Sequence, residues 1–589
     1  MNSRHLVFGI VMSLVVYKLP AQTIPKIDIQ LNQLGFYPNG SKLAVLTRSV
    51  PGNIFYLVTK DLKDTVFQAA LGPTITSKNS SLTTRVADFS SFKKQGNYVV
   101  VVPGARNSFP FRIEGSVHRP VSIAVLKGYY YQRVSMPLEG KYAGKWNRPA
   151  GHPDTAVLIH PSAASEKRPA GTVIASPGGW YDAGDYNKYI VNSGITMGTI
   201  LSAYEDFPAY FKQLKTNIPE SDNNIPDILD EVLYNLRWML TMQDPVDGGV
   251  YNKCTNASFD GMVMPGVTKA PRYVVQKGTS ATLDFAAVTA QSARILKRFE
   301  KELPGLSDSC LRAAKLAWKW ALANPEMVYN QTANNKKFLP VISTGGYGDR
   351  HFEDEFFWAA CELFCTTLSD EYLPVIEKNN SATFSIPSWA NVQMPGFYSL
   401  FRNTGSISSK LNTFITEAKQ KLLSFADEVQ MGADSSAFKT VMGKSRRDFN
   451  WGSNSNAANQ SIVLINAYLL TRNKKYIDNA LTNLDYILGR NATGYSFVTG
   501  VGTRYPMHPH HRQSVADGID EPVPGLLAGG PNPGKQDGCD YEYNEPETAY
   551  ADVDCSFASN EIAINWNAPL VYLANAVEAL QYEVGYTKK

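Results

Sequence analysis

Two carboxylates stand among aromatic and small residues in the segment Gly-Gly-Trp-Tyr-Asp-Ala-Gly-Asp-Tyr, residues 178–186. They are Asp182 and Asp185, three positions apart. The small residues let a substrate or a water molecule approach closely, and the aromatic residues offer flat apolar faces for sugar rings. A carboxylate fixed beside such faces can hold a nucleophilic water molecule as a general base. A helix N-cap followed by a turn would use the same residue types, so the spacing alone leaves both interpretations open.

A third carboxylate, Glu561, opens a strongly apolar helical pattern near the end of the chain. A glutamate in the first turn of a helix interacts favourably with the helix dipole, which is a purely structural role. Against an apolar wall the pKa of Glu561 would rise, and the protonated carboxyl group could then act as a general acid. The residue by itself does not choose between the two roles.

Two histidines and an arginine, His510, His511 and Arg512, follow one another in a loop after Pro509. Such a group suits metal binding, anion binding or hydrogen bonds to sugar hydroxyls, and paired histidines are also common as plain surface residues. A zinc site is disfavoured because the histidines lack a third ligand at a characteristic spacing.

The composition excludes several classes of protein. The chain has 589 residues, 44% of them hydrophobic and 19% charged, which is typical of a globular protein and not of a disordered chain or a coiled coil. The length allows roughly two to four domains. The net charge is +4 and there is no long basic run, so we expect no nucleic-acid partner.

The first 21 residues have the pattern of a secretory signal peptide. Arg4 precedes an apolar run over residues 6–17, which is too short to span a membrane, and Pro20-Ala21 follows it. No later stretch approaches 18 apolar residues. We therefore expect an exported protein, periplasmic or secreted, with no membrane span.

The pattern of hydrophobic residues changes once along the chain. Residues 27–113 contain short alternating and β-branched runs separated by Pro, Gly, Asn and Ser, which predicts a small β-sandwich. From residue 117 the apolar residues recur at helical spacing, and about ten to twelve helices joined by long Gly- and Pro-rich loops fit an α-barrel. The connection over residues 114–119 is short, so the sandwich should dock directly on the barrel.

Six cysteines are present, an even number that export would allow to form disulfides. Cys361 and Cys365 lie on a helical pattern, where both would be buried. Cys539 and Cys555 flank a loop rich in Asp, Glu and Tyr, and the sequence leaves open whether they are bonded.

Several ordered motifs together resemble glycoside hydrolase family 9, a family of inverting endoglucanases. The motifs are Asp182-Ala183-Gly184-Asp185; Ser496 to Thr499 with Gly502, Arg504, Pro509, His510 and Arg512; and Tyr550, Asp552, Phe557, Glu561, Ala563, Asn567 and Ala568. Supporting stretches begin at Gly248, Trp451 and Gly529, and residues 29–36 are similar to the start of the immunoglobulin-like domain of many members. The resemblance implies an all-β immunoglobulin-like sandwich over residues 27–113 followed by an all-α (α/α)6 barrel over residues 117–585.

The resemblance also implies the roles of the candidate site residues. Asp185 is the expected general base, helped by Asp182, and Glu561 is the expected general acid. Asp552 is expected to orient the acid or tune its proton affinity, and His510 and Arg512 to bind sugar hydroxyls. Tyr181, Trp451 and His511 complete the candidate substrate-binding set.

The sequence departs from the family pattern at three places. Asn252 stands where many members have His, so a sugar contact is expected to differ there. His152 and His160 have no accompanying Cys, so the zinc site of some members is not expected. Thr344, Asp349, Asp354 and Glu355 resemble a family calcium loop whose oxygens suit a hard cation, although Ala390 or Asn391 replaces a later Asp and a solvated acidic turn would look the same.

The resulting prediction is an inverting endo-β-1,4-glucanase that acts on cellulose-like or xyloglucan-type plant polysaccharides. It would be a monomer that needs no cofactor for its chemistry, with calcium as a structural ion. The alternative is a catalytically inactive carbohydrate-binding protein on the same fold, which would bind glucan without releasing reducing sugar.

Overall fold

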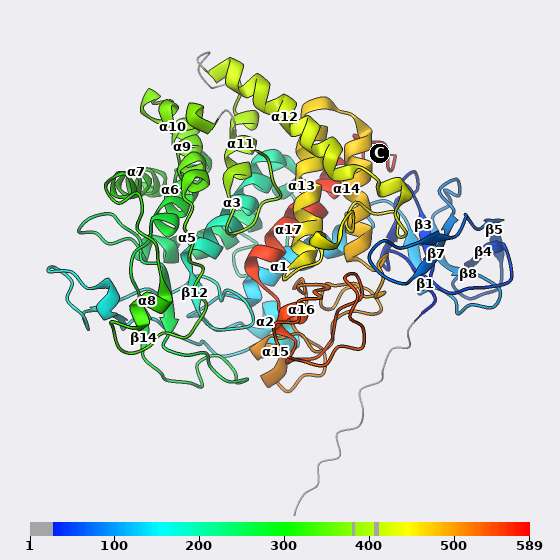
Figure 1. Ribbon diagram of the computed structural model, residues 1–589, viewed down its shortest axis with the longest axis horizontal. Helices are drawn as coiled ribbons and strands as arrows, with labels where there is room; N and C mark the ends of the chain where they lie inside the picture. The colour runs from blue at the N-terminus through cyan, green and yellow to red at the C-terminus, as the bar shows by residue number, and fades with distance from the viewer. Residues whose placement is uncertain (1–26, 380–382, 406–410, 589) are drawn as a thin grey trace, which may run out of the picture.

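The computed structural model describes residues 27–379, 383–405 and 411–588, shown in Figure 1. The predicted signal peptide, residues 1–21, lies outside the described residues. The described chain forms a small β domain followed by a larger helical domain, in the predicted order. Over these ranges, no helix combines the length and the apolar character that crossing a membrane requires.

The N-terminal domain is a sandwich of two sheets. One sheet has the order β1–β3–β7–β6 and the other β2–β9–β8–β4–β5, with all pairs antiparallel except β2 and β9. The strands are β1 (Ile29–Gln30), β2 (Gly35–Phe36), β3 (Leu43–Leu46), β4 (Ile54–Thr59), β5 (Thr65–Ala70), β6 (Ile75–Thr76), β7 (Thr83–Asp88), β8 (Gly96–Val101) and β9 (Phe111–Ile113). The ring of Phe36 packs edge-on against Phe89 and Phe111 with centroids 5.4 Å away, and this aromatic group fills the core between the sheets.

The second domain is built mainly from long helices. They are α1 (Arg119–Tyr131), α3 (Ile190–Asp206), α5 (Asp227–Thr241), α6 (Thr279–Leu296), α7 (Leu306–Ala323), α9 (Glu353–Thr367), α11 (Gln393–Arg402), α12 (Asn412–Gln430), α13 (Ser453–Thr471), α14 (Lys474–Ile487) and α17 (Ile564–Leu580). Short helices lie between them: α2 (Gly140–Ala143), α4 (Pro208–Phe211), α8 (Gln331–Asn335), α10 (Leu373–Lys378), α15 (Arg512–Ala516) and α16 (Phe557–Asn560).

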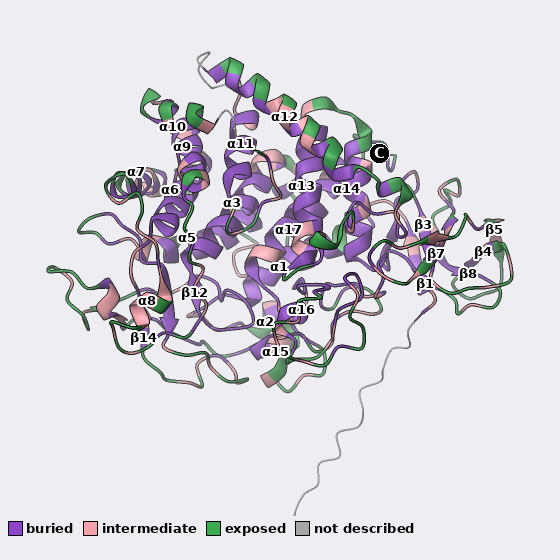
Figure 2. Cartoon of the chain, in the orientation of Figure 1, coloured by how far each residue is buried: buried purple, intermediate pink, exposed green. Residues whose placement is uncertain are grey.

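Helices α3, α6, α13 and α17 are buried on nearly every side, whereas α12 buries one face only, as Figure 2 shows. The buried residues of α12 include Phe414, Ala418 and Leu422, which recur at helical spacing. Helix α17 packs against α1, α3 and α13, and α6 packs against α3, α7 and α9. The interior helices therefore form a continuous core. This core supports the loops that precede the helices.

The helical domain also contains a sheet that the all-α prediction missed. Its order is β11 (Val173–Ile174), β10 (Val157–Ile159), β14 (Arg272–Val274), β13 (Lys253–Asn256) and β12 (Lys188–Tyr189). Strands of two to four residues give no detectable period in the sequence, which is why the pattern did not predict them. Strand β12 leads directly into α3, so this sheet supports the segment that carries Asp182 and Asp185.

The sandwich contacts the helical domain through polar side chains that are largely buried. The side-chain oxygen of Gln33 accepts hydrogen bonds from the backbone N–H groups of Thr503 and Arg504, each at 2.8 Å. The hydroxyl of Tyr37 donates to Glu578 at 2.5 Å, and its ring stacks on Tyr586. A buried donor or acceptor that loses its partner lowers the free energy of unfolding, so the two domains stabilise each other.

We expect that a chain beginning at Ser116 melts at a lower temperature than the mature chain, because removal of the sandwich exposes this interface. Gln33→Ala in the full chain should lower the melting temperature by a smaller amount, since it breaks only the contacts to the 494–504 region. Calorimetry of the three proteins checks the order. Equal melting temperatures with full activity would contradict direct docking. The isolated sandwich is expected to pass a glucan affinity gel without retardation.

Candidate active site

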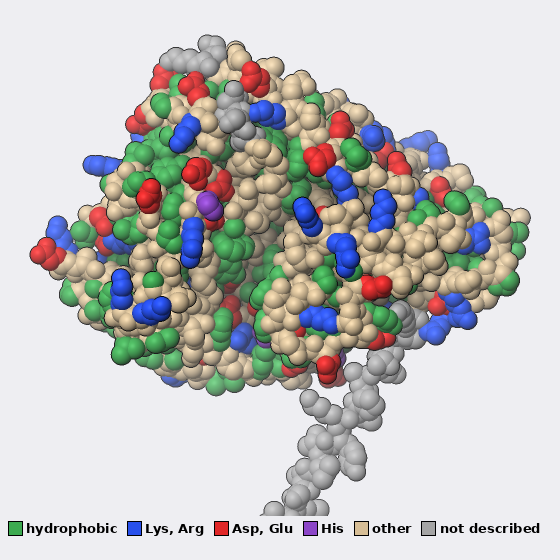
Figure 3. All heavy atoms as spheres, viewed as in Figure 1, with side chains coloured by type: hydrophobic (Ala, Val, Ile, Leu, Met, Phe, Trp, Pro, Cys, Tyr) green, Lys and Arg blue, Asp and Glu red, His purple; other side chains and the backbone are tan. Residues whose placement is uncertain are grey.

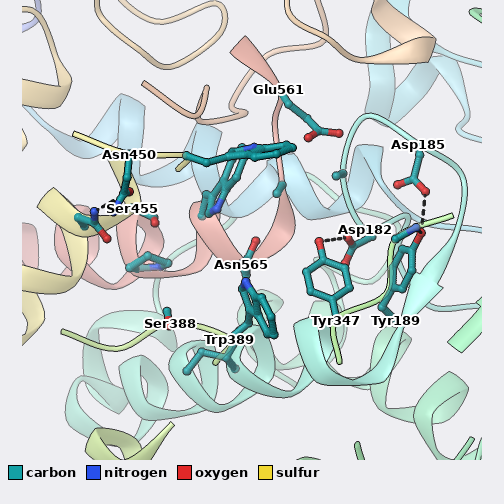
Figure 4. Close-up of a pocket in the computed structure, with 18 of the residues that line it drawn as sticks. Asp182, Asp185, Tyr189, Tyr347, Ser388, Trp389, Asn450, Ser455, Glu561 and Asn565 are labelled. Atoms are coloured by element: carbon teal, nitrogen blue, oxygen red, sulfur yellow. Dashed lines mark hydrogen bonds between the residues drawn. The ribbon is translucent and has the colours of Figure 1, made fainter. Parts of the chain in front are cut away.

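A cleft of about 510 Å³ lies where several loops enter the N-terminal ends of α3, α9, α11, α13 and α17. Figure 3 shows the surface hollowed near the centre of this face, and Figure 4 shows the cleft in close-up. Three carboxylic residues line it, Asp182, Asp185 and Glu561. Its aromatic lining consists of Tyr189, Phe259, Tyr347, Trp389, Trp451 and Trp566. The structure therefore brings the three predicted carboxylates into one cavity with flat aromatic surfaces.

The segments that carry the acidic residues are joined directly, although they lie far apart in the sequence. Ala183 and Ala563 form an antiparallel bridge, and the N–H of Ile564 donates to the carbonyl of Asp182 at 2.8 Å. Gly184 lies so close to the histidine loop that a Cβ there would be 2.0 Å from the carbonyl oxygen of His510. This close approach explains why the turn between the two aspartates contains glycine.

Both carboxylate oxygens of Asp182 are committed to hydrogen bonds. One accepts from the Asn192 amide at 2.6 Å and the other from the Tyr347 hydroxyl at 2.8 Å. The pKa of Asp182 is raised to about 8, mainly by burial and then by the neighbouring Asp185, while the two donors act in the opposite direction. Asp182 is thus held in a fixed orientation by two donors, in surroundings that disfavour its charge.

Asp185 keeps one oxygen available. Its Oδ2 accepts from the Asn187 amide at 2.5 Å and from the Tyr189 hydroxyl at 3.2 Å. No described residue donates a hydrogen bond to Oδ1. In Figure 4 the carboxyl groups of Asp185 and Glu561 point towards the same space. A water molecule held by the available oxygen would face the acid across the cleft.

Glu561 is half-buried and is positioned by its backbone. It forms a parallel bridge with His510, and its carbonyl accepts from the Gly529 N–H at 2.8 Å. Burial raises the pKa of Glu561 well above its usual value, and the charges of Asp185 and Asp182 add to this, against a smaller opposing effect of Arg512. The group therefore keeps its proton in a range where an ordinary glutamate is ionised, as a general acid must.

The histidine loop supports the site more than it lines it. His510 donates from Nδ1 to the carbonyl of Asp554 at 2.6 Å, and burial lowers its pKa. His511 is buried beside Gln132 and Ser514. The guanidinium of Arg512 donates to the carbonyls of Gly184 at 2.8 Å and Asp260 at 2.9 Å. None of the three is among the side chains that line the cleft.

Two other predicted residues lie outside the cleft and one lies inside it. Asp552 accepts from the N–H groups of Met507 and His508 at 2.8 and 2.9 Å, so it ties the histidine loop to the segment before Glu561. Tyr181 is buried, with its hydroxyl 2.8 Å from Nδ1 of His152. Trp451 lines the cleft and is 42% exposed, which leaves a ring surface for a sugar.

Sequence reasoning missed the two tyrosines that hold the aspartates. Tyr347 sits within the predicted calcium loop, and Tyr189 follows the aspartate motif by a few residues, so both were near residues already selected. Asn252, expected to alter a sugar contact, instead donates to the carbonyl of Gly346 at 3.2 Å and supports the turn that carries Tyr347.

The predicted calcium residues lie partly together. Asp349, Asp354 and Glu355 interact with one another and with Asp284 of α6, and burial is the main cause of the raised pKa of Asp284 and Glu355. The oxygens of Thr344 instead accept from Lys253 and Gln331. Within the described ranges, no set of three or more His, Cys, Asp or Glu side chains is gathered closely enough to hold a metal ion.

Cys539 and Cys555 are joined by a disulfide, which answers the question that the sequence left open. The bond closes the loop that contains Asp552 and ends just before α16. The other four cysteines, Cys254, Cys310, Cys361 and Cys365, are free and buried.

Comparison with known sequences gives two family matches and several similar proteins. Glycosyl hydrolase family 9 matches residues 121–574, and the cellulase N-terminal ig-like domain matches residues 25–107. A xyloglucan-specific endo-beta-1,4-glucanase of Bacteroides ovatus is 48% identical over 97% of this chain and 97% of the relative. Endoglucanase D of Acetivibrio thermocellus is 34% identical over 92% of this chain and 82% of the relative.

Solved structures agree in fold. Bacteroides ovatus GH9 superposes with a TM-score of 0.90 at 47% identity, covering 94% of this chain and 99% of that chain. A metagenome-derived glycoside hydrolase family 9 endoglucanase gives a TM-score of 0.84 at 32% identity, covering 94% and 98%.

Proposed function

The chain belongs to glycosyl hydrolase family 9, and from this membership we propose that it is an inverting endo-β-1,4-glucanase whose substrate is xyloglucan. The family resemblance and the immunoglobulin-like N-terminal domain expected from the sequence are confirmed. Xyloglucan is chosen among β-1,4-glucans because the 48% identical relative is named as specific for it. We also infer that the paired helices close into an (α/α)6 barrel, with domains at residues 27–113 and 117–585.

The observation that carries the proposal is the pairing of two unlike carboxyl groups across one cleft. Glu561 gives its proton to the departing glycosidic oxygen as the bond to the anomeric carbon breaks. Asp185 takes a proton from the water molecule whose oxygen attacks that carbon from the opposite face. Two carboxyl groups about 6.5–9.5 Å apart leave room for this water in inverting enzymes. Glu561 ends ionised and Asp185 protonated, and exchange with solvent restores both.

A polysaccharide panel tests activity and substrate together. Xyloglucan, carboxymethylcellulose and mixed-linkage β-glucan are assayed at equal mass for reducing-sugar release and for loss of viscosity. Xyloglucan should be cleaved fastest, with an early fall in viscosity because internal bonds are cut. Faster release from carboxymethylcellulose would reject the substrate, and binding without release from any glucan would favour the inactive carbohydrate-binding alternative. The presence of Asp182, Asp185 and Glu561 in one cleft argues against that alternative.

We expect inversion of configuration at the anomeric carbon, because Asp185 activates water and does not attack carbon itself. Proton NMR of the first products from a β-linked oligosaccharide should show the α-anomer, followed by slow mutarotation. A β-anomer as the initial product would mean that the two carboxyl groups work as a retaining pair.

We propose that Asp349, Asp354, Glu355 and Asp284 draw together around a calcium ion when it binds, since these described side chains are not yet gathered as a ligand set. Several of their buried oxygens have no hydrogen-bond partner among the described residues, including both of Glu355 and both of Asp284. The side-chain oxygen of Asn391, at the position that departs from the family, is buried and unpartnered as well. Carboxylate and amide oxygens of this kind suit Ca²⁺, whereas Thr344 is engaged with Lys253 and does not fit the set.

Calcium removal should lower the melting temperature, because the buried carboxylates then lose their counter-charge. Differential scanning calorimetry with EDTA and with added calcium measures the shift. Glu355→Gln should abolish the response to calcium, whereas Glu353→Gln, on the exposed side of the same helix turn, should keep it. A melting temperature indifferent to EDTA in the wild type would reject the proposal.

We propose that the protein is exported after cleavage near Ala21 and acts as a monomer. The disulfide between Cys539 and Cys555 supports an oxidising compartment.

A further inference from the structure

Lys253 is a fully buried lysine that forms no ion pair with any described carboxylate. It lies on β13, and its Nζ donates to the Gly345 carbonyl at 2.6 Å, the Gln331 side-chain oxygen at 2.7 Å and the Thr344 hydroxyl at 2.9 Å. Among the described residues, no Asp or Glu oxygen lies within 4.0 Å of its Nζ, whereas the buried Lys188 has Asp154 at 2.7 Å. Burial lowers the pKa of Lys253 to about 7, against a smaller opposing effect of the Asp185 charge. A lysine buried at this cost and bonded to three neutral oxygens points to a task for its hydrogen-bond donors.

The contacts of Lys253 lead to the general base. Lys253 and Tyr189 are cross-strand partners on β13 and β12, and the ammonium lies 5.5 Å from the centre of the Tyr189 ring. The Tyr189 hydroxyl accepts from the Gly345 N–H at 3.1 Å and donates to Asp185 at 3.2 Å. Gly345 therefore links the two residues: its carbonyl accepts a hydrogen bond from Lys253, and its N–H donates one to Tyr189.

The same turn leads to the second aspartate. Tyr347 donates to Asp182 at 2.8 Å, and its backbone has a φ of 46°, in the left-handed region that a tyrosine seldom adopts. Such a conformation persists only where the surroundings hold it. The hydrogen bonds of Lys253 to Thr344 and Gly345 fix the start of this turn. One buried lysine therefore anchors the turn that contacts both aspartates.

We propose that Lys253 is a positioning residue for hydrolysis, which holds the turn over residues 344–347 so that Tyr189 and Tyr347 keep Asp185 and Asp182 in place. The proposal rests on the glucanase function proposed above. Lys253 does not line the cleft, so it acts through these neighbours and has no contact with the substrate. The loss of positioning should appear mainly in kcat, since both aspartates lose their support, whereas Trp389, Trp451 and Trp566 on the cleft wall keep their surroundings.

The first test replaces Lys253 with methionine, which keeps most of the length of the side chain and removes its hydrogen-bond donors and its charge. We expect kcat on xyloglucan to fall by about 100-fold, the scale of a small misplacement of a reacting group, with a much smaller change in KM. Lys42→Met is the matched control. Lys42 is also fully buried and donates only to neutral carbonyls, those of Pro38 and Gly40 at 2.8 Å, but it lies in the sandwich. It should lower the melting temperature while kcat per folded molecule stays at the wild-type value.

A double-mutant cycle with Tyr189→Phe tests the route of the effect. If Lys253 acts through Tyr189, the fold-loss in kcat of the double variant should be much smaller than the product of the fold-losses of the two single variants. Lys253→Gln, which keeps one donor, replaces the methionine variant if that chain does not fold, and it should lose less activity. Wild-type kcat in a folded Lys253 variant, a loss confined to KM, or independent losses in the cycle would each overturn the proposal. Absence of hydrolysis by the wild type would reject the glucanase function instead.

Discussion

Glu561→Gln should reduce kcat on xyloglucan by about 10²- to 10⁴-fold, the usual contribution of general acid catalysis. The amide keeps the shape of the side chain but has no proton to give to the leaving oxygen. Binding of a xyloglucan oligosaccharide, measured by calorimetry, should be retained because the cleft surface is unchanged. Glu578→Gln is the matched control, since Glu578 is also buried with a raised pKa but lies at the domain interface, bonded to Tyr37.

A substrate with a better leaving group distinguishes loss of the general acid from general damage to the active site. An aryl β-cellobioside whose phenol leaves without protonation should be cleaved by Glu561→Gln at a rate much closer to that of the wild type. A variant equally slow on both substrates, or one that retains most of its activity on xyloglucan, would show that Glu561 is not the acid.

The same substitution has a pH-dependent effect on stability. The pKa of Glu561 is raised in the folded chain, so the folded state binds this proton more tightly than the unfolded state does. Stability is therefore lost as pH rises above the unfolded pKa of about 4.3. Glu561→Gln should melt higher than the wild type at about pH 8 and at the same temperature at about pH 4. Thermal unfolding at the two pH values measures the difference.

Asp185→Asn should reduce kcat by a similar factor, about 10²- to 10⁴-fold, because the amide cannot accept a proton from the attacking water. In contrast to the acid variant, it should stay slow on the activated aryl cellobioside, since a better leaving group does not replace the base. Asp185→Ala with added azide should form the α-glycosyl azide, because the small anion can occupy the place of the water.

Asp182→Asn provides the comparison for the base. Asp182 uses both oxygens to hold Asn192 and Tyr347, so its replacement should cost less than the loss of Asp185. Steady-state kinetics of the two variants on xyloglucan give the order. A larger loss in Asp182→Asn, with substantial activity left in Asp185→Asn, would transfer the role of base to Asp182.

The sequence predicted the order of the domains and selected the residues that meet in the cleft. Asp182, Asp185 and Glu561 could be found because their sequence neighbours form ordered motifs, and such motifs can be recognised without knowing the fold. The sequence did not indicate that Ala183 and Ala563 pair, since this contact joins distant segments and depends on the packing of α17 against α3.

Several residues expected to contact the sugar are buried in the structure and lie outside the lining of the cleft. His511, Arg512 and Tyr181 are of types that bind sugars, and in the structure they contact Gln132, the Gly184 carbonyl and His152. Residue type does not reveal burial in a loop, because loops have no period from which a buried face could be inferred. The short strands β12 and β13 also have too few residues to show a period. Lys253 and Tyr189, which lie on them, were therefore not selected from the sequence.

The bridge between Ala183 and Ala563 has a consequence for the chain as it is synthesised. The base segment leaves the ribosome almost four hundred residues before the acid does. The sandwich and the first helices can acquire structure during that interval, since domains fold as they emerge. The catalytic pair exists only after α17 has entered between α1, α3 and α13. A chain that stops before Glu561 is therefore inactive however well its earlier parts fold, and hydrolysis reports that translation has passed that residue.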